Sequence, residues 1–222
     1  MITGWPCPTP SGASSEEYAL AFDDNRPHRL LIVPALFDEA NRLRRFTVET
    51  MRRLDAVGID SFLPDLPGTN ESQAPLAAQS LATWRTAMAA AASHFRATHV
   101  LALRGGALVA PSLPGWALAP VSGGSVLRQM LRSRILTARE AGKDETSEAL
   151  LATGRDLGLV LAGHDLGPAM IRELEAAEPA ANLAPITQSE LGGSALWLRA
   201  EPDEDPAQSA ALGQVVARAL QS

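Results

Sequence analysis

Residues 98–111 read Thr-His-Val-Leu-Ala-Leu-Arg-Gly-Gly-Ala-Leu-Val-Ala-Pro. The first half is apolar and partly β-branched, which is typical of a buried strand, and the segment from Ala107 onwards is typical of the start of a buried helix. Between them, Arg104 and two glycines predict a sharp turn. A strand that bends abruptly into a helix is the geometry of a nucleophile elbow, in which the turn residue projects from the top of a parallel sheet. We therefore expect Arg104 at the apex of such an elbow.

The elbow consensus is Gly-x-Ser-x-Gly, and the corresponding residues are Ala102-Leu103-Arg104-Gly105-Gly106. The second glycine is kept, alanine replaces the first, and an arginine stands where the serine would be. Arginine remains protonated and offers five donors but no lone pair, so it cannot be the nucleophile of acyl transfer. The sequence thus predicts the frame of a hydrolase with its serine chemistry removed or replaced. It leaves open whether the protein is an enzyme.

Composition narrows the class of protein. The chain has 222 residues, of which 46% are hydrophobic and 20% charged, as is usual for a globular domain. The net charge of −6 argues against a nucleic-acid partner, and a single cysteine, Cys7, excludes an intrachain disulfide. No apolar run approaches the roughly 20 residues of a membrane span, and the first residues lack the basic and apolar regions of a signal peptide. We expect a cytoplasmic protein without a cofactor.

Apolar runs alternate with amphipathic segments along the chain. Strands are predicted at 17–22, 29–33, 59–63, 98–103, 116–121, 157–162 and 195–198, and helices at about 38–57, 80–97, 125–141, 145–153, 168–177 and 206–220. This alternation predicts an α/β fold, with a mainly parallel sheet and helices on both faces. Residues 1–16, rich in Pro, Gly and Ser, are expected to form a loose arm, and 178–193 an irregular link. The helical excursion of about 123–177 is expected to be a lid subdomain within one domain that spans 1–222.

Several short motifs, in order along the chain, match one family. Residues 34–45 (Pro-Ala-Leu-Phe-Asp-Glu-Ala-Asn-Arg-Leu-Arg-Arg) are similar to a Pro-Phe-Glu-Glu-Met-Asn-x-x-Arg-Arg block, and 65–72 to an Asp-Leu-x-Gly-x-Gly-x-Ser loop. Residues 103–107 are similar to a Gly-Leu-Arg-Leu-Gly-Ala elbow. Residues 119–132 are similar to Gln-Pro-Val-x-x-Gly followed by Leu-x-Gln-x-Leu-Arg, and 162–166 to Ala-Gly-Tyr-Glu-Leu. In these motifs the chain resembles the exosortase A system-associated hydrolases of type 2.

The resemblance implies an α/β-hydrolase-like fold with a helical lid, in bacteria that make exopolysaccharide and process exported proteins with an exosortase. Members of the family are called hydrolases largely by fold, and they already carry the elbow arginine. This chain departs from the pattern in that Thr69 and Asn70 replace the loop's second glycine, His164 replaces the tyrosine, and Ala102 replaces the first elbow glycine. The late acid and histidine of ordinary hydrolases have no clear equivalents.

Arg104 and the amides of Gly105 and Gly106 at a helix start favour an anion. Two acids, Glu39 and Asp65, follow neighbouring strands at the edge where open α/β sheets bind ligands. One interpretation is a buried ion pair of Arg104 with either acid that plugs the old active site, because an unpaired buried guanidinium is costly. The other is a site for a small anionic or saccharide-related ligand. The candidate ligand-binding residues are Arg104, Gly105, Gly106, Asn41 and Phe37.

His164 is a candidate general base, but it would need water or a nucleophile and an orienting acid, and its neighbour Asp165 points elsewhere in most geometries. A loop or lid-packing histidine is the favoured interpretation. A metal site from Asp38, Glu39, Asp65 and His164 lacks a helical i, i+4 ligand pair, and we expect none.

Three functions remain open at this point. The first is a pseudoenzyme, a noncatalytic or catalytically altered member of the hydrolase fold. The second is an active hydrolase of an ester or an acyl- or glycan-type substrate, using water, Asp65 or Glu39 as the acid group, and Arg104 as an oxyanion stabiliser. The third is a scaffold or binding protein that meets a protein partner through its lid.

Overall fold

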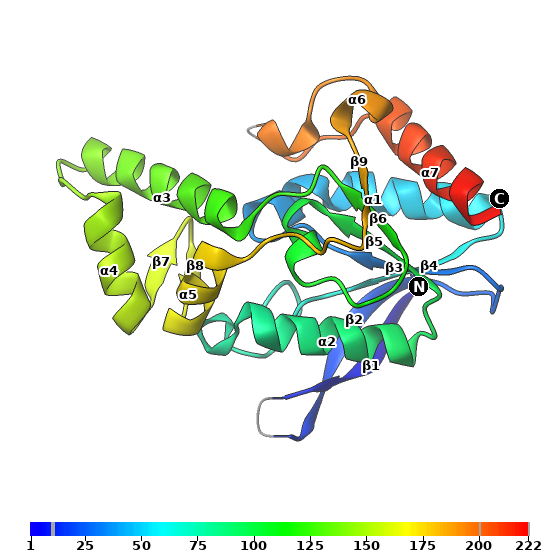
Figure 1. Ribbon diagram of the computed structural model, residues 1–222, viewed down its shortest axis with the longest axis horizontal. Helices are drawn as coiled ribbons and strands as arrows, with labels where there is room; N and C mark the ends of the chain where they lie inside the picture. Colours follow the sequence, from blue (N-terminus) through cyan, green and yellow to red (C-terminus); the bar gives the residue numbers. More distant parts are fainter. Residues whose placement is uncertain (10–11, 200, 222) are drawn as a thin grey trace.

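The computed structural model describes residues 1–9, 12–199 and 201–221. Its main sheet has seven strands in the order β1-β2-β4-β3-β5-β6-β9 (Figure 1). The strands are β1 (Ile2–Pro8), β2 (Ser14–Phe22), β3 (Arg29–Val33), β4 (Asp60–Pro64), β5 (His99–Leu103), β6 (Gly115–Leu118) and β9 (Ala184–Ile186). From β4 to β9 the strands run parallel, and the β1–β2 hairpin joins antiparallel to β4. The predicted α/β class with a mainly parallel sheet is confirmed.

Helices cover both faces of this sheet. They are α1 (Asp38–Ala56), α2 (Leu81–His94), α3 (Gly123–Glu140), α4 (Ser147–Leu157), α5 (Pro168–Ala176), α6 (Gln188–Leu191) and α7 (Pro206–Gln221), with 3-10 helices η1 (Leu76–Ala78), η2 (Arg104–Leu108) and η3 (Leu196–Leu198). Alternate residues of each strand point to opposite faces. In β3, Leu30 and Ile32 therefore pack with α1 and α7, and Leu31 and Val33 pack with α2.

The N-terminal segment corrects the expectation of a loose arm. Residues 2–8 form the edge strand β1, which pairs along its whole length with β2. Trp5 and Cys7 alternate inward and are buried, whereas their neighbours are exposed. The prolines and serines obscured this alternation. Residues 10 and 11 of the expected arm lie outside the described part of the chain.

The end of the sheet also differs from the prediction. Residues 195–198, predicted as the last strand, contain η3, whose Leu196 and Trp197 are buried in the α1–α7 layer rather than by strand pairing. The last strand is β9, inside the segment expected to be irregular. β9 has the sequence Ala-Pro-Ile, and proline weakens a strand signal because it cannot donate to the ladder.

The lid segment, which we define as residues 123–177, projects from one end of the sheet (Figure 1). It contains α3, α4 and α5, as expected, but also a two-stranded hairpin of β7 (Leu159–Leu161) and β8 (His164–Leu166). Ala162 and Gly163 form its turn with φ of 49° and 81°, the positive values that tight hairpin turns require. The segment 157–162 therefore contributes a strand to the lid and not to the main sheet. Its treatment as a lid subdomain remains a prediction.

Within the described ranges, none of the helices is both long and apolar enough to cross a membrane.

Candidate functional site

A sharp turn, expected at Arg104 and called the elbow below, lies at the end of β5. Arg104 has φ of 52°, and a non-glycine residue in this region of backbone conformation is strained. A Cβ atom on Gly106 would lie 2.4 Å from the carbonyl oxygen of Pro34, so only glycine allows the turn to approach the end of β3 this closely. The helix that follows is the five-residue 3-10 helix η2, not the predicted α-helix. Pro111 limits the length of this helix, because the residue before a proline avoids the α conformation.

Arg104 is held by protein groups on every nitrogen of its guanidinium. Its Nε and Nη2 donate to Oε2 and Oε1 of Glu39, each at 3.1 Å, and its Nη1 donates to the carbonyl of Ala119 at 2.7 Å. The guanidinium carbon lies 4.2 Å from the ring centre of Trp197. Only 13% of the Arg104 side chain and 9% of the Glu39 side chain are exposed. The elbow position therefore holds a mostly buried, bidentate ion pair.

Asp65, the other acid considered for Arg104, has different partners. It follows β4, it is buried, and its Oδ1 accepts from Nη1 of Arg44 at 3.3 Å and from Nδ2 of Asn70 at 2.5 Å. Arg44 lies on α1, so Asp65 joins the loop after β4 to that helix. Of the two candidate acids, the structure brings Glu39 to the elbow.

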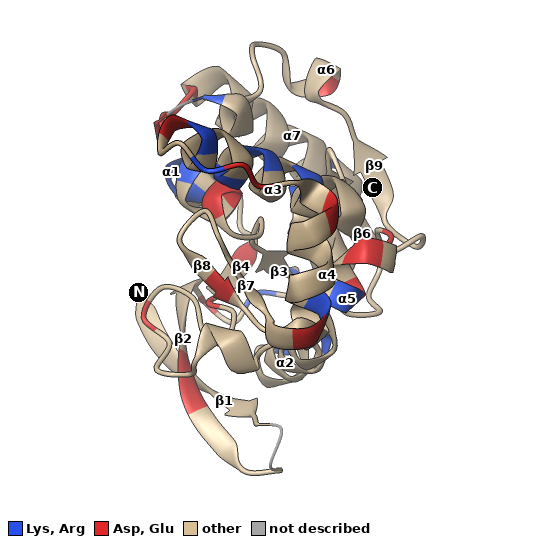
Figure 2. Cartoon of the chain, turned by 90° about the vertical axis from the view of Figure 1, so that its left-hand side faces the viewer, with Lys and Arg blue, Asp and Glu red and all other residues tan. Residues whose placement is uncertain are grey.

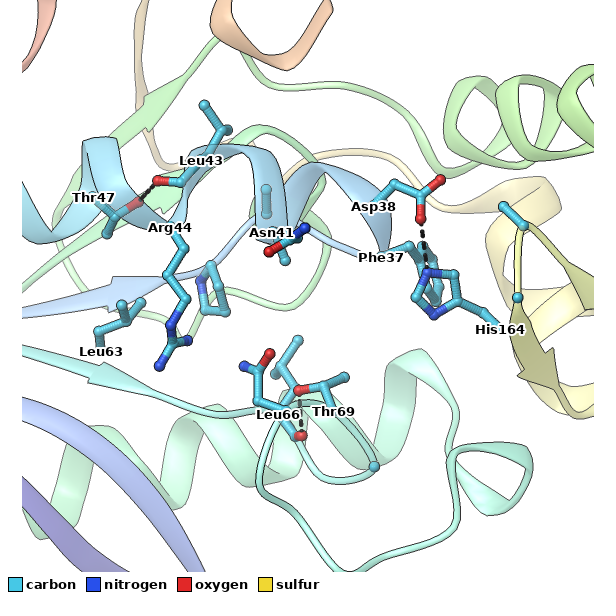
Figure 3. A pocket seen from close by; sticks show the side chains of 17 residues that line it. Phe37, Asp38, Asn41, Leu43, Arg44, Thr47, Leu63, Leu66, Thr69 and His164 are labelled. Atoms are coloured by element: carbon cyan, nitrogen blue, oxygen red, sulfur yellow. Dashed lines mark hydrogen bonds and ion pairs between the residues drawn. The ribbon is translucent and has the colours of Figure 1, made fainter. Parts of the chain in front are cut away.

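A pocket of 420 Å³ lies beside the elbow, and Figure 3 shows it from close by. One wall is a stripe of α1 and the residue before it, where Phe37, Asn41 and Arg44 recur at the spacing of one helix face. The loop after β4 forms the second wall, and the turn of the β7–β8 hairpin closes the end. Phe37 and Asn41, two predicted ligand-binding residues, line this pocket. The other three, Arg104, Gly105 and Gly106, are not among its lining residues.

His164 reaches this pocket from the hairpin turn. Its Nε2 lies 3.1 Å from Oδ1 of Asp38, the first residue of α1, and its ring packs edge-on against Phe37 with centres 5.4 Å apart. Asp165, its sequence neighbour, is exposed. The orienting acid is thus Asp38, which lies far away in sequence. The sequence signals for this pair are the Ala162-Gly163 turn and an acid at the start of a helix. The contact between His164 and Asp38 could not be predicted from them, because it depends on how the lid segment folds.

Phe37 holds an unusual backbone conformation at this point. Its φ of 55° and ψ of −131° are normally accessible to glycine alone, and such strain costs on the order of 1–3 kcal/mol. The ring is buried, with centres 5.7 Å from Trp84 and 5.4 Å from His164. Strain of this kind persists only where packing enforces it. It fixes the direction in which α1 begins and thereby the position of Asp38.

Asn41 is exposed at the pocket wall, and no group in the described ranges hydrogen-bonds its amide. In the same part of the chain, no group of three or more His, Cys, Asp or Glu side chains is arranged to hold a metal ion. The polar side chains that line the pocket are therefore the amides of Asn41 and Asn70, the hydroxyls of Thr47 and Thr69, the guanidinium of Arg44 and the Asp38–His164 pair.

Neither a family model nor a curated protein matches this sequence. Solved structures do resemble it. A candidate hydrolase from Agrobacterium vitis S4 is similar with a TM-score of 0.57 and 13% identity, over 79% of this chain and 71% of that one. The mouse alpha/beta hydrolase domain-containing protein 10 follows with a TM-score of 0.49 and 10% identity, over 79% and 69% of the two chains. The mainly parallel sheet flanked by helices and the first of these similarities together show an α/β-hydrolase fold.

Proposed function

We propose that this protein is a catalytically altered α/β-hydrolase-fold protein without a serine nucleophile. Its elbow serves the structure, and it binds a small ligand in the neighbouring pocket of α1, the loop after β4 and the β7–β8 turn. One observation carries the proposal. Every guanidinium nitrogen of Arg104 already has a protein partner, whereas the amide of Asn41, in the wall of the pocket, has none within the described ranges.

Energetics support this division of roles. An anion at Arg104 would have to displace Glu39, and a buried carboxylate left without its partner costs roughly 3–5 kcal/mol. The amides of Gly105 and Gly106 are buried in a single short 3-10 helix, which adds little dipole. The pocket of 420 Å³, by contrast, falls within the range of about 300–1,000 Å³ typical of small-molecule sites.

The charges at the pocket favour an uncharged ligand over a strongly anionic one. Arg44 is the cation in its wall, and Asp65 already neutralises it. A second acid, Asp38, stands at the opposite end. Of the two ligand classes expected from the sequence, the saccharide-related one fits these groups better than the anionic one.

The resemblance to exosortase A system-associated hydrolases supports a place in exopolysaccharide or exosortase-linked biology, in the cytoplasm of a bacterium. That placement rests on the shared motifs of residues 34–45, 65–72, 103–107, 119–132 and 162–166.

Two other functions keep some support. A hydrolase that uses Glu39 as its acid group is disfavoured, because both carboxylate oxygens of Glu39 accept from Arg104. The Asp38–His164 pair is the observation that favours an active hydrolase.

The observation that favours a scaffold role is a set of exposed apolar residues in the lid segment, Leu136, Leu157 and Val160. Figure 2 shows acidic and basic residues interspersed at this end of the molecule, which suits a protein partner better than a polyanion.

The test is a titration with the uncharged probes butyramide and methyl glucoside, followed by NMR chemical shifts. We expect saturable binding of at least one probe, weakened at least fivefold by Asn41→Ala and unchanged by Arg104→Lys, which keeps a cation on Glu39. A fluorophosphonate should label no serine. Binding that depends on Arg104 and ignores Asn41, or serine labelling, would overturn the proposal.

A further inference from the structure

We infer that His164, oriented by Asp38, is a general base that activates water in this pocket, and that the pocket hydrolyses small uncharged acyl esters without a covalent intermediate. The inference rests on the proposed ligand site, since the reaction takes place in the same pocket.

The Asp38–His164 contact defines which ring nitrogen carries the proton. A carboxylate only accepts hydrogen bonds, so the Nε2 of His164, at 3.1 Å from Asp38, must be the N–H. A neutral imidazole has one N–H, and Nδ1 is then left with a lone pair. The histidine of a catalytic triad is also oriented by an acid, but there the acid holds Nδ1 and Nε2 is the base, so the two nitrogens have exchanged roles in His164. The edge-on contact with Phe37 restricts rotation of the ring further.

Besides a general base, the reaction needs a hydrogen-bond donor for the oxyanion, and the amide of Asn41 supplies it. Asn41 lies three residues after Asp38 on α1, so the two side chains are neighbours on the helix surface, with Cβ atoms about 5–6 Å apart. Its amide has no other partner among the described residues, and Figure 3 shows it between Asp38 and Arg44 on the pocket wall. A free amide N–H beside the reacting carbonyl stabilises the oxyanion that forms there.

The reaction balances without any further reagent. The water oxygen bonds to the acyl carbon, its proton passes to Nδ1 of His164, and the carbonyl π electrons move onto oxygen, where the Asn41 amide donates to them. The C=O bond then re-forms, the bond to the alcohol oxygen breaks, and the leaving oxygen takes the proton back from Nδ1. The products are a carboxylic acid and an alcohol, and His164 returns to its starting state.

The lining sets the class of substrate. Phe37, Leu66 and Ala162 give the pocket an apolar portion, and its volume of 420 Å³ limits the acyl chain to a short one. Because Asp65 neutralises Arg44, the described residues that line the pocket offer no free cation to an anionic acyl group. Short-chain neutral esters therefore fit the pocket better than anionic ones, and 4-nitrophenyl butyrate is the probe.

The experiment measures hydrolysis of 4-nitrophenyl butyrate by the full chain. His164→Gln should lower kcat/KM by about 100-fold or more, the usual share of general-base catalysis. Asn41→Ala should lower it by a similar factor of about 100. Asp38 is a positioning residue, so Asp38→Asn should lower kcat with KM nearly unchanged. His94→Gln is the matched control, because His94 is an exposed histidine at the end of α2, and it should retain full activity.

Two further readouts distinguish direct attack by water from an acyl-enzyme. The wild type should show no burst of nitrophenolate, and a fluorophosphonate should not inhibit it. The inference is overturned by a burst, by full activity in His164→Gln, or by the absence of saturable turnover. Butyramide binding without turnover would refute this inference and leave the proposed function standing. Loss of both binding and turnover in Arg104→Lys would instead refute the proposed function.

Discussion

Replacing Arg104 by methionine should lower the free energy of unfolding by about 3 kcal/mol. The side chains of Arg104 and Glu39 are 13% and 9% exposed, and removing one partner of a buried ion pair costs roughly 3–5 kcal/mol. The residual exposure places the expected cost at the low end of that range. A domain of this size loses roughly 2–4 °C of Tm per kcal/mol, so thermal unfolding followed by circular dichroism should show a drop of about 6–12 °C.

A double-mutant cycle with Glu39→Gln tests the cause of this cost. If the penalty comes from an unpaired buried charge, the double variant should be more stable than the sum of the two single effects, with a coupling of about 1–3 kcal/mol. The matched control is Glu49→Gln on the same helix, which removes an exposed pair with Arg52 and should cost about 0.5 kcal/mol or less. A cost for Arg104→Met no greater than that for Glu49→Gln, or a coupling near zero, would show that the buried Arg104–Glu39 pair does not cause the penalty.

Three further predictions concern the turn and the N-terminal hairpin. Gly106→Ala would place a Cβ atom 2.4 Å from the backbone oxygen of Pro34. It should lower the free energy of unfolding, measured by urea denaturation, by about 2 kcal/mol or more. An unchanged free energy would mean that the turn is less tight than described. Burial, with Glu17 nearby, raises the pKa of the Cys7 thiol to about 12, so a disulfide reagent at pH 8 should modify Cys7 only after unfolding, and rapid modification of the folded chain would contradict this. Burial also raises the pKa of the Glu17 carboxyl above its usual value, so the folded state binds the carboxyl proton more tightly than the unfolded state does. The stability that this protonation adds is fully present below about pH 4 and is lost as the pH rises through the raised pKa. Glu17→Gln should therefore stabilise the protein at neutral pH and flatten the pH dependence of its Tm, and lower stability at pH 8 would refute the assignment.

Hydrophobic periodicity was sufficient to predict most of the fold. The parallel strands β3, β4 and β5 are continuous apolar runs, and the elbow followed from residues 98–111 alone. The strands of the main sheet that escaped prediction, β1 and β9, both contain proline, which a strand tolerates at the edge of a sheet. These segments form strands because the folded chain places them along the two edges of the sheet, and hydrophobic periodicity carries no information about that placement.

The candidate site was predictable only in part. The cost of burying a guanidinium predicts that Arg104 has an acid partner. The sequence does not predict whether that partner is Glu39 or Asp65, because the outcome depends on Arg44 and Asn70, which bind Asp65. The Asp38–His164 pair joins the start of α1 to a hairpin turn in the lid segment. Adjacent carboxylates, such as Asp165, are poor guides to such a pair, because neighbouring side chains of a strand point to opposite faces.

The central claim is that a ligand binds in the pocket beside Asn41 and not at Arg104. A crystal structure of the protein soaked with butyramide tests this claim most directly. Electron density for the amide beside Asn41 and His164, with Arg104 still bonded to both oxygens of Glu39, is the predicted result. Density on the Arg104 guanidinium or on the amide of Gly105, with Glu39 displaced, would contradict it.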